Sequence, residues 1–275
     1  MSDRHDRVLI LAINYNTSAA TETLLRSIGA ADASDDVRVC IVDNSDREPL
    51  DPVRAAAAFA NRAELEVIRT PKNLGYFGAA CWAFERMSPA ERPAWTIVCN
   101  VDLEFDRRFF AALHACDPQV GAVAPAILRK DNEHDQNPFM RNRPSRRRMH
   151  AYVWMLAHPR LYVAYEFGSD IKARLGASRS SVPSVSGPIY APHGACIAFS
   201  RRYFESGGNL RHPAFLYAEE FFVAETAREL GLAVRHETSL IVRHASQTST
   251  SRLSARGRGL RAHEATREIV RRYFG

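Results

Sequence analysis

Short hydrophobic runs alternate with amphipathic stretches along the first part of the chain. Hydrophobic runs bounded by turn residues are typical of buried strands, and apolar residues spaced three and four apart are typical of helices. The pattern predicts strands at 8–13, 37–42, 65–68, 95–102 and 120–124, and helices at 18–29, 52–61, 75–87 and 109–115. Thr17 or Ser18 is expected to cap the first of these helices, and Asp106 the last. Because strands separated by single helices form right-handed crossovers, we predict a largely parallel, doubly wound α/β sheet.

The regular pattern breaks down between about residues 131 and 186, in a segment rich in proline, arginine and serine. Arginines come first and aromatic residues follow, at Arg141, Arg143, Arg146, Arg147 and Arg148, then at Tyr152, Trp154, Tyr162, Tyr165 and Phe167. Such a segment is typical of a surface that lies on an anionic membrane or binds a lipid-linked acceptor. A solvated, flexible insert over a packed helix is the alternative interpretation.

Helix and strand patterns resume after this insert. They predict strands at 194–199, 233–235 and 239–242, and helices at 201–205, 218–230 and 260–274. Glu219 and Glu220 open the helix at 218–230, where the helix dipole favours acidic side chains. The helix at 260–274 is basic, and we expect it to be a docking or surface helix.

Polar residues follow each of the first four predicted strands. They are Asn14 and Asn16 after the first, Asp43, Asn44, Ser45 and Asp46 after the second, Lys72, Asn73 and Gly75 after the third, and Asn100 and Asp102 after the fourth. Open parallel sheets bind ligands at the carboxyl edge of their strands, and a carboxylate there can hold a metal against a phosphate. Asp102 alone would more often be a turn or helix-cap residue than a ligand, since loops after strands are polar in any case. Four polar strand ends in register favour a ligand site.

Composition narrows the class of protein. A chain of 275 residues with 46% hydrophobic content can bury a sizeable core in one large domain. The net charge of +6 suits phosphate-bearing ligands or an anionic membrane surface. Arginine carries nearly all of this charge, and no stacking-aromatic motif accompanies it, so we predict no specific nucleic-acid binding.

The cysteines and the N-terminus indicate a compartment. The five cysteines are scattered without a C-x-x-C pair, which is typical of buried free thiols in a reducing environment. A charged N-terminus leads directly into the first strand, and no run of 18 apolar residues occurs. We therefore expect a cytoplasmic protein, and a peripheral position at the inner face of the cell membrane is compatible with this expectation.

A set of short motifs occurs in order from residue 8 to 245: Asn14-Tyr15-Asn16, Val42-Asp43-Asn44-Ser45, Asn73-Leu74-Gly75-Tyr76-Phe77-Gly78, Asn100-Val101-Asp102, Gly194-Ala195-Cys196-Ile197-Ala198-Phe199, Tyr217-Ala218-Glu219-Glu220 and Val242-Arg243-His244. Together they resemble the family 2 glycosyltransferases, inverting enzymes of the GT-A fold, and in detail their rhamnosyltransferase-like bacterial members. The resemblance implies a Rossmann-like, mixed but mostly parallel sheet flanked by helices. It implies one catalytic domain over 1–250, with a nucleotide-sugar half at 1–125, an acceptor half at 126–250 that includes the insert at 131–186, and a basic C-terminal helix at 251–275.

The resemblance also assigns ligands. Asp102 would be the chief ligand of Mg²⁺ or Mn²⁺ and His244 a second one, since such ions take further oxygens from water and substrate phosphates. Asp43 would accept a hydrogen bond from the imide N–H of uracil or thymine, which favours a UDP- or dTDP-sugar. The other expected nucleotide-sugar-binding residues are Asn14, Asn16, Asn44, Lys72, Asn73, Gly75 and Asn100. Alternatives remain for both key residues: Asp43 as a turn-forming residue, and His244 as an ordinary core or surface histidine.

Inversion by direct displacement requires a base that deprotonates the acceptor hydroxyl. The family places this base at the position of Glu220, with Glu219 beside it. The chain departs from the family here, because the usual aspartate is the longer Glu220 and Phe222 replaces a common second acid. Two adjacent carboxylates at a helix start are otherwise ordinary dipole partners.

The resemblance therefore implies an inverting, metal-dependent glycosyltransferase of bacterial surface polysaccharide synthesis. It would move a sugar from a UDP- or dTDP-sugar to a hydroxyl of a saccharide or lipid-linked saccharide. The alternatives are a non-catalytic nucleotide-sugar-binding partner protein and a sugar-phosphate nucleotidyltransferase, which would need a glycine-rich loop where this chain has Asn14-Tyr15-Asn16-Thr17. The sequence leaves the donor sugar, acceptor, linkage and oligomeric state open.

Overall fold

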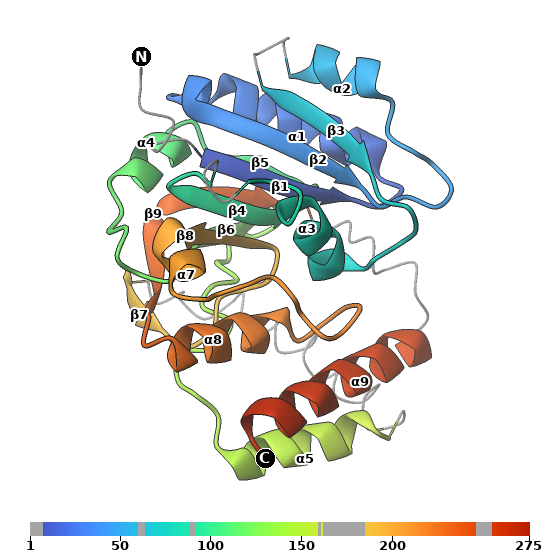
Figure 1. The fold of residues 1–275 in the computed structure, drawn as a ribbon, viewed down its shortest axis with the longest axis vertical. Helices are drawn as coiled ribbons and strands as arrows, with labels where there is room; N and C mark the ends of the chain where they lie inside the picture. Colours follow the sequence, from blue (N-terminus) through green and yellow to red (C-terminus); the bar gives the residue numbers. More distant parts are fainter. Residues whose placement is uncertain (1–7, 60–63, 89–91, 159–160, 162–184, 246–254) are drawn as a thin grey trace.

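A computed structural model describes residues 8–59, 64–88, 92–158, 161, 185–245 and 255–275. One mixed sheet runs through them, with the strands β1 (Val8–Asn14), β2 (Val37–Asp43), β3 (Leu65–Arg69), β4 (Trp95–Asn100), β5 (Leu103–Phe105), β6 (Ala122–Arg129), β7 (Gly187–Ile189), β8 (Cys196–Ser200) and β9 (Val234–His244). The order across the sheet is β3-β2-β1-β4-β8-β6-β9-β5, and β7 pairs with β9 (Figure 1).

The first half of the sheet is parallel, as the alternation of strands and helices predicts. β3, β2, β1 and β4 are neighbours in parallel register, so their carboxyl ends meet at one edge. β8 then lies antiparallel between β4 and β6, while β6 and β9 are parallel. The predicted α/β class with a mostly parallel sheet is confirmed.

Helices cover both faces of this sheet. They are α1 (Ser18–Ala30), α2 (Pro52–Ala58), α3 (Tyr76–Phe84), α4 (Phe109–His114), α5 (Arg146–Leu156), α7 (Arg201–Glu205), α8 (Glu219–Glu229) and α9 (Ala255–Tyr273), and a short 3-10 helix spans Ser34–Asp36. Side chains of β1 alternate between the faces: Leu9 and Leu11 pack with α3 and α8, whereas Val8 and Ile10 pack with α1 and α4. β1 is buried on both faces, which explains its continuous hydrophobic run.

Two predicted helix caps differ in the structure. Arg108, not Asp106, is the residue that precedes α4, although the Asp106 carboxylate accepts a hydrogen bond from the Arg108 N–H at 3.0 Å. Thr17 precedes α1 but makes no side-chain cap, because its hydroxyl donates to Asn14 Oδ1 instead.

The last strand is also longer than predicted. The runs at 233–235 and 239–242 belong to the single strand β9, which pairs with β6. The register shifts between Pro125 and Ala126 of β6, where proline offers no N–H to the ladder. Residues 238–240 of β9, between the partners of Pro125 and Ala126, lie at this irregularity.

The insert and the C-terminal helix are packed together. α5 forms within the insert and lies along α9 (Figure 1). Residues 162–184 of the insert, with Tyr162, Tyr165 and Phe167, lie outside the described residues. α9 was expected to be a docking or surface helix, and its apolar face is buried, with Ala265, Ile269 and Val270 in the core beside α8.

The cysteines are free, and Cys40, Cys99 and Cys196 are buried, as predicted. In the part of the chain that the structure describes, no helix combines the length and hydrophobicity needed to cross a bilayer.

Candidate functional site

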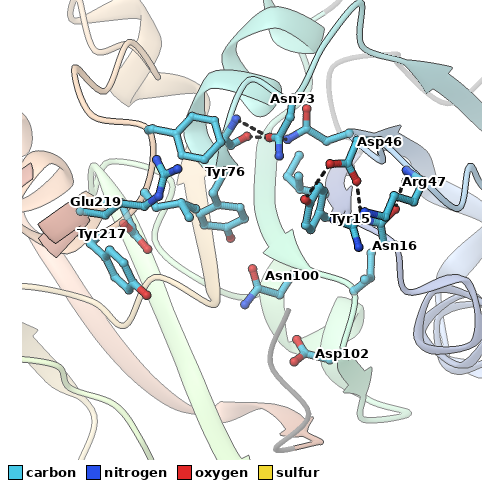
Figure 2. A pocket seen from close by; sticks show the side chains of 17 residues that line it. Tyr15, Asn16, Asp46, Arg47, Asn73, Tyr76, Asn100, Asp102, Tyr217 and Glu219 are labelled. Carbon is cyan, nitrogen blue, oxygen red and sulfur yellow. Dashed lines mark hydrogen bonds between the residues drawn. The ribbon is translucent and has the colours of Figure 1, made fainter. Parts of the chain in front are cut away.

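A pocket opens at the carboxyl edge of the parallel strands. Its cavity volume is about 530 Å³, which suits a small-molecule ligand. It is lined by Ile13, Tyr15, Asn16, Asn44, Asp46, Arg47, Asn73, Gly75, Tyr76, Asn100, Val101, Asp102, Phe215, Leu216, Tyr217, Glu219 and Arg261. Figure 2 shows Tyr15, Asn16, Asp46 and Arg47 at one side of the pocket, Tyr217 and Glu219 at the other, and Asn100 with Asp102 between them.

Asn16 organises the first side of the pocket from a left-handed backbone conformation, at φ 54°. Its side-chain Nδ2 donates to Asp46 Oδ1 at 2.8 Å, and its Oδ1 accepts from the Arg47 and Glu48 N–H groups. Tyr15 Oη donates to Asp46 Oδ2 at 3.2 Å. The hydrogen bond from Asn16 is the main reason that the pKa of Asp46 lies below its usual value, so this side of the pocket carries a carboxylate anion.

Asn14 and Asp43, two predicted nucleotide-binding residues, are buried behind this wall. Asn14 Nδ2 donates to Asp43 Oδ1 at 2.9 Å, and the other carboxylate oxygen of Asp43 accepts from the Leu50 N–H at 2.9 Å. Asp43 Oδ1 also accepts a hydrogen bond from the Ser45 N–H at 3.2 Å, which closes a turn after β2. The residue is 2% exposed and does not line the pocket, so its contacts are those of the turn-forming alternative. Tyr15 and Arg47 were not predicted as wall residues, and Asp46 was predicted only as one of the polar residues after the second strand. The direction of this turn decides which of these side chains faces the pocket.

Asn44 joins the ends of β2 and the loop before α3. Its Oδ1 accepts from the Leu74 N–H at 2.8 Å, and its Nδ2 donates to Asn73 Oδ1 at 2.8 Å and to the Gly75 carbonyl at 3.0 Å. Asn44, Asn73 and Gly75 line the pocket as predicted for binding residues, whereas Lys72 is exposed and lies off its wall.

Gly75 lets a second loop approach. It has φ +75°, and a Cβ there would lie 2.0 Å from the Phe215 carbonyl oxygen. The Tyr76 N–H donates to the same carbonyl oxygen at 3.3 Å. Only glycine fits this contact, which brings the loop at 215–217 against the strand ends.

Asp102 and His244 meet where β5 pairs with β9. Asp102 Oδ2 lies 3.2 Å from His244 Nε2, and both side chains are almost completely buried. His244 Nδ1 lies 2.8 Å from Gln136 Oε1, an amide oxygen that accepts a hydrogen bond, and this contact orients the ring with Nε2 toward the aspartate. Nε2 itself is buried without a hydrogen-bond partner.

These residues fit a divalent cation. A carboxylate oxygen and an unpartnered imidazole nitrogen are adjacent, and the imidazole is oriented by a second hydrogen bond, which is the usual arrangement around a metal. Among the described residues, no group of three or more His, Cys, Asp or Glu side chains gathers as a metal cluster. A cation at Asp102 and His244 would therefore take its other ligands from water and substrate, as Mg²⁺ and Mn²⁺ commonly do. Gln136 was not among the site residues predicted from the sequence.

Glu219 and Glu220 begin α8 after two residues with left-handed backbones. Tyr217 has φ 70° and Ala218 φ 63°, and such conformations cost energy in residues other than glycine. The bend turns Glu219 into the pocket wall, whereas Glu220 Oε1 accepts from the Gly194 N–H at 3.3 Å. Sequence analysis placed the base at Glu220 with Glu219 beside it; of the two, Glu219 lines the pocket.

The two carboxylates converge on Gly194. A Cβ at that position would lie 2.7 Å from Glu219 Oε1 and 3.0 Å from Glu220 Oε1. Tyr76 Oη donates to the Gly194 carbonyl at 2.8 Å and so fixes this backbone. Burial raises the pKa of Glu220 to about 7, and burial together with the charge of Glu220 raises the pKa of Glu219 well above its usual value. A carboxyl pair with raised pKa values is suited to proton transfer near neutral pH.

Phe222 and Arg261 complete the surroundings. Phe222 is 1% exposed and packs edge-on against Phe77, so the missing second acid of the family pattern falls on a core position.

Arg261 comes from α9 and lies over the Phe215 ring, 4.7 Å from its centroid. Sequence reasoning did not connect the C-terminal helix with the site.

No protein-family model matches the sequence, and no curated protein matches it either. Solved glycosyltransferase structures share the fold. The mannosyltransferase PcManGT from Pyrobaculum calidifontis, in complex with GDP-Man and Mn²⁺, is 18% identical with a TM-score of 0.58 over 96% of this chain and 64% of its own. GalNAc-T7 with UDP, GalNAc and Mn²⁺ is 13% identical with a TM-score of 0.59, over 90% of this chain and 45% of its own. S. aureus TarS is 11% identical with a TM-score of 0.55, over 89% of this chain and 37% of its own.

The chain thus has the GT-A fold, as the sequence resemblance predicted. It spans less than two thirds of the length of each of these structures. Family 2 and rhamnosyltransferase-like membership stay predictions.

Proposed function

We propose that the protein is an inverting, metal-dependent glycosyltransferase that moves a sugar from a UDP- or dTDP-sugar to a hydroxyl of a saccharide acceptor. One observation carries the proposal: Asp102, which faces the unpartnered Nε2 of His244, shares a pocket with Glu219. A metal-binding pair and a carboxyl of raised pKa on the same cavity are the two parts that this reaction needs. The fold shared with sugar transferases supports the same conclusion.

The donor would lie along the side formed by the strand ends. Asn16, Asn73 and Asp46 offer hydrogen-bonding groups to a base and ribose, and Asn100 lies beside Asp102 for the sugar (Figure 2). Asn44 holds the shape of this side, because its amide is already bonded to Leu74, Asn73 and Gly75. Asn14 and Asp43 support this side from behind through their hydrogen bond, and Gly75 allows the loop at 215–217 to approach it. Uracil or thymine would donate its imide N–H to a carboxylate here, either Asp43 after a change of the turn or Asp46 directly.

Asp102 and His244 would hold Mg²⁺ or Mn²⁺, which neutralises the negative charge that develops on the diphosphate as it leaves. The acceptor oxygen attacks the anomeric carbon from the face opposite the diphosphate. The carbon–oxygen bond to the phosphate breaks, the nucleoside diphosphate departs, and the configuration inverts. The proton of the acceptor hydroxyl passes to Glu219, while Glu220 keeps its place on the Gly194 N–H.

We place the base at Glu219 because its side chain lines the cavity. Glu220 lies next to it and raises its pKa, so the two carboxyls are expected to share one proton when the pH is near neutral. Donor turnover should therefore rise with increasing pH, as protons leave two carboxyls whose pKa values are both raised by burial.

The proposal extends to a lipid-linked acceptor in bacterial surface polysaccharide synthesis. The support is α5, which carries the exposed residues Arg146, Arg147, Arg148 and Trp154 and no acidic residue. Exposed arginines beside an exposed tryptophan suit the anionic face of a membrane. A peripheral position at the inner face of the cell membrane would follow.

Donor hydrolysis tests the proposal, since a transferase commonly leaks some donor to water. UDP-, dTDP- and GDP-sugars are first screened by thermal shift with Mn²⁺, because a ligand that binds only the folded state raises its melting temperature. The donor that binds should be hydrolysed with Mn²⁺ and not with EDTA, and Asp102→Ala should abolish turnover. A protein that binds donor but never releases the sugar would be the non-catalytic partner that the sequence leaves open.

A further inference from the structure

We infer that Arg261 of the C-terminal helix α9 binds the diphosphate of the donor, an inference that rests on the proposed function. The charged side chains of the pocket wall are the carboxyls Asp46, Asp102 and Glu219 and the arginines Arg47 and Arg261. A diphosphate that enters among three carboxyl groups requires cationic partners beyond one metal ion. The two arginines are therefore the side chains of the wall that can supply further positive charge.

Arg47 lies on the side of the pocket formed by Asn16 and Asp46. Its backbone N–H donates to Asn16, and its charge acts on Asp46, whose pKa it helps to lower. Figure 2 shows Arg47 beside Asn16 and Asp46, across the pocket from Glu219. This arrangement suits the base and ribose end of a donor rather than its diphosphate.

Arg261 is held in a binding orientation by an aromatic ring. The guanidinium carbon lies 4.7 Å from the centroid of Phe215, and the side chain is half-buried. Stacking on a ring occupies one face of a guanidinium and leaves its N–H groups free in the plane, which is how arginine binds phosphate. Phe215 is itself fixed against Gly75, so Arg261 stands next to the loop that carries Asn73.

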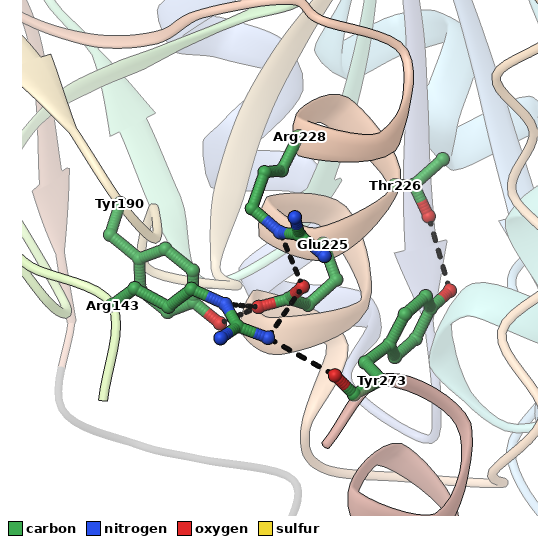
Figure 3. A network of polar contacts seen from close by, with 6 residues as sticks. All are labelled: Arg143, Tyr190, Glu225, Thr226, Arg228 and Tyr273. Atoms are coloured by element: carbon green, nitrogen blue, oxygen red, sulfur yellow. Dashed lines mark hydrogen bonds and ion pairs between the residues drawn. The ribbon is translucent and has the colours of Figure 1, made fainter. Parts of the chain in front are cut away.

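A network around the buried Glu225 anchors the far end of α9 and thereby the position of Arg261 (Figure 3). Glu225 of α8 is completely buried and accepts from Arg143 Nε at 2.7 Å, Arg228 Nε at 2.7 Å and Tyr190 Oη at 2.6 Å. Arg143 also donates to the Tyr273 carbonyl at 3.1 Å near the end of α9. The apolar face of the helix, with Ala265 and Ile269, is packed into the core.

Arg143, one of the arginines of the insert, contacts the end of α9 and is therefore not part of the proposed membrane surface. Arg143 lies over the Phe274 ring, 4.2 Å from its centroid, in addition to its contacts with Glu225 and Tyr273. The insert, α8 and α9 are thus tied together at the end of α9 opposite Arg261. Any change that releases this end should move Arg261 away from the pocket.

The test compares a nucleoside diphosphate with its nucleoside. Binding of UDP or dTDP, and of uridine or thymidine, is measured by calorimetry with Mn²⁺ for the intact protein and its variants. Arg261→Ala should weaken diphosphate binding about 10- to 100-fold, because a charge-assisted hydrogen bond to phosphate is lost, and leave nucleoside binding within twofold. Arg261→Lys should keep part of the diphosphate affinity, and Arg267→Ala, an exposed arginine on the same helix, should change neither.

Two results would overturn the inference. One is unchanged diphosphate binding in Arg261→Ala, and the other is an equal loss for diphosphate and nucleoside, which would indicate a general disturbance of the pocket. Nucleoside binding by the variant shows that it is folded. A wild-type protein that binds no nucleotide would overturn the proposed function together with the inference, whereas failure of Arg261 alone leaves the proposed function standing.

Discussion

Gly194→Ala is the substitution that most sharply perturbs the carboxyl pair. The added methyl would lie 2.7 Å from Glu219 Oε1, 2.8 Å from Glu219 Cγ and 3.0 Å from Glu220 Oε1. Ordinary contact begins near 3.4 Å, so the Glu219 carboxyl must move by about 0.7 Å, the difference between these two separations. Because all three atoms belong to side chains and none to the backbone, the loss of stability should be about 1 kcal/mol, at the low end for overpacking.

The activity should fall far more than the stability. Misplacing a catalytic group by roughly 1 Å costs about 100-fold, so a shift of this size is expected to lower kcat by about 10- to 100-fold. Donor affinity should remain, because Gly194 does not line the cavity. The assay is metal-dependent turnover of the donor, with the melting temperature and donor affinity measured on the same preparations.

Gly78→Ala is the matched control. Gly78 lies in α3, and a Cβ there would meet only Leu74 Cβ, at 3.5 Å. That variant should keep its turnover and lose no stability, since alanine is the better helix former. Turnover of Gly194→Ala within twofold of the wild type would refute the placement of the pair around Gly194.

Three further predictions concern the donor side of the pocket, the network around Glu225 and the arginines of α5. Asp46→Asn should weaken donor binding with little change in melting temperature, and Asp43→Asn should mainly lower the melting temperature; calorimetry and thermal unfolding would contradict this if the effects were exchanged. Burial alone would raise the pKa of Glu225, but its hydrogen bonds outweigh burial and hold that pKa below the usual value. The resulting stability is present above about pH 4.5 and is lost as the pH falls through the lowered pKa. Glu225→Gln should cost about 2 kcal/mol near neutral pH, or about 4–8 °C, with a smaller difference in acid, whereas Glu229→Gln on the exposed side should cost little. Replacing the arginines at 146–148 with serine should weaken sedimentation with vesicles that contain anionic lipid and leave donor binding unchanged, and equal sedimentation of both proteins would remove α5 as the membrane surface.

The sequence was most informative where the physical signal is local. Alternating hydrophobic and amphipathic stretches predicted the parallel half of the sheet, and the polar ends of its strands placed Asn16, Asn44, Asn73 and Asp102 at one edge. Each of these residues lies within a few positions of the end of a parallel strand. Their common edge follows from the direction of parallel strands alone.

What could not be predicted depends on contacts between distant segments. β8 enters the sheet between β4 and β6, and Arg261 reaches the pocket because α9 packs on α8. Which glutamate faces the cavity depends on the left-handed conformations of Tyr217 and Ala218, which no glycine signalled. The same holds after β2, where hydrogen bonds to Asp43 turn its side chain inward and expose Asp46.

The most direct test of the central claim is donor turnover in a matched pair of variants, Glu219→Gln and Glu220→Gln, measured with Mn²⁺ across pH 5 to 9. Glu219→Gln should lower turnover by at least about 100-fold at every pH while donor binding is retained, because the carboxyl group that takes the proton of the acceptor hydroxyl is gone. Glu220→Gln should keep measurable turnover, with its pH dependence shifted to lower pH because the neighbouring charge that raises the pKa of Glu219 is gone. Full turnover in Glu219→Gln together with loss in Glu220→Gln would contradict the account and place the base one residue further along α8.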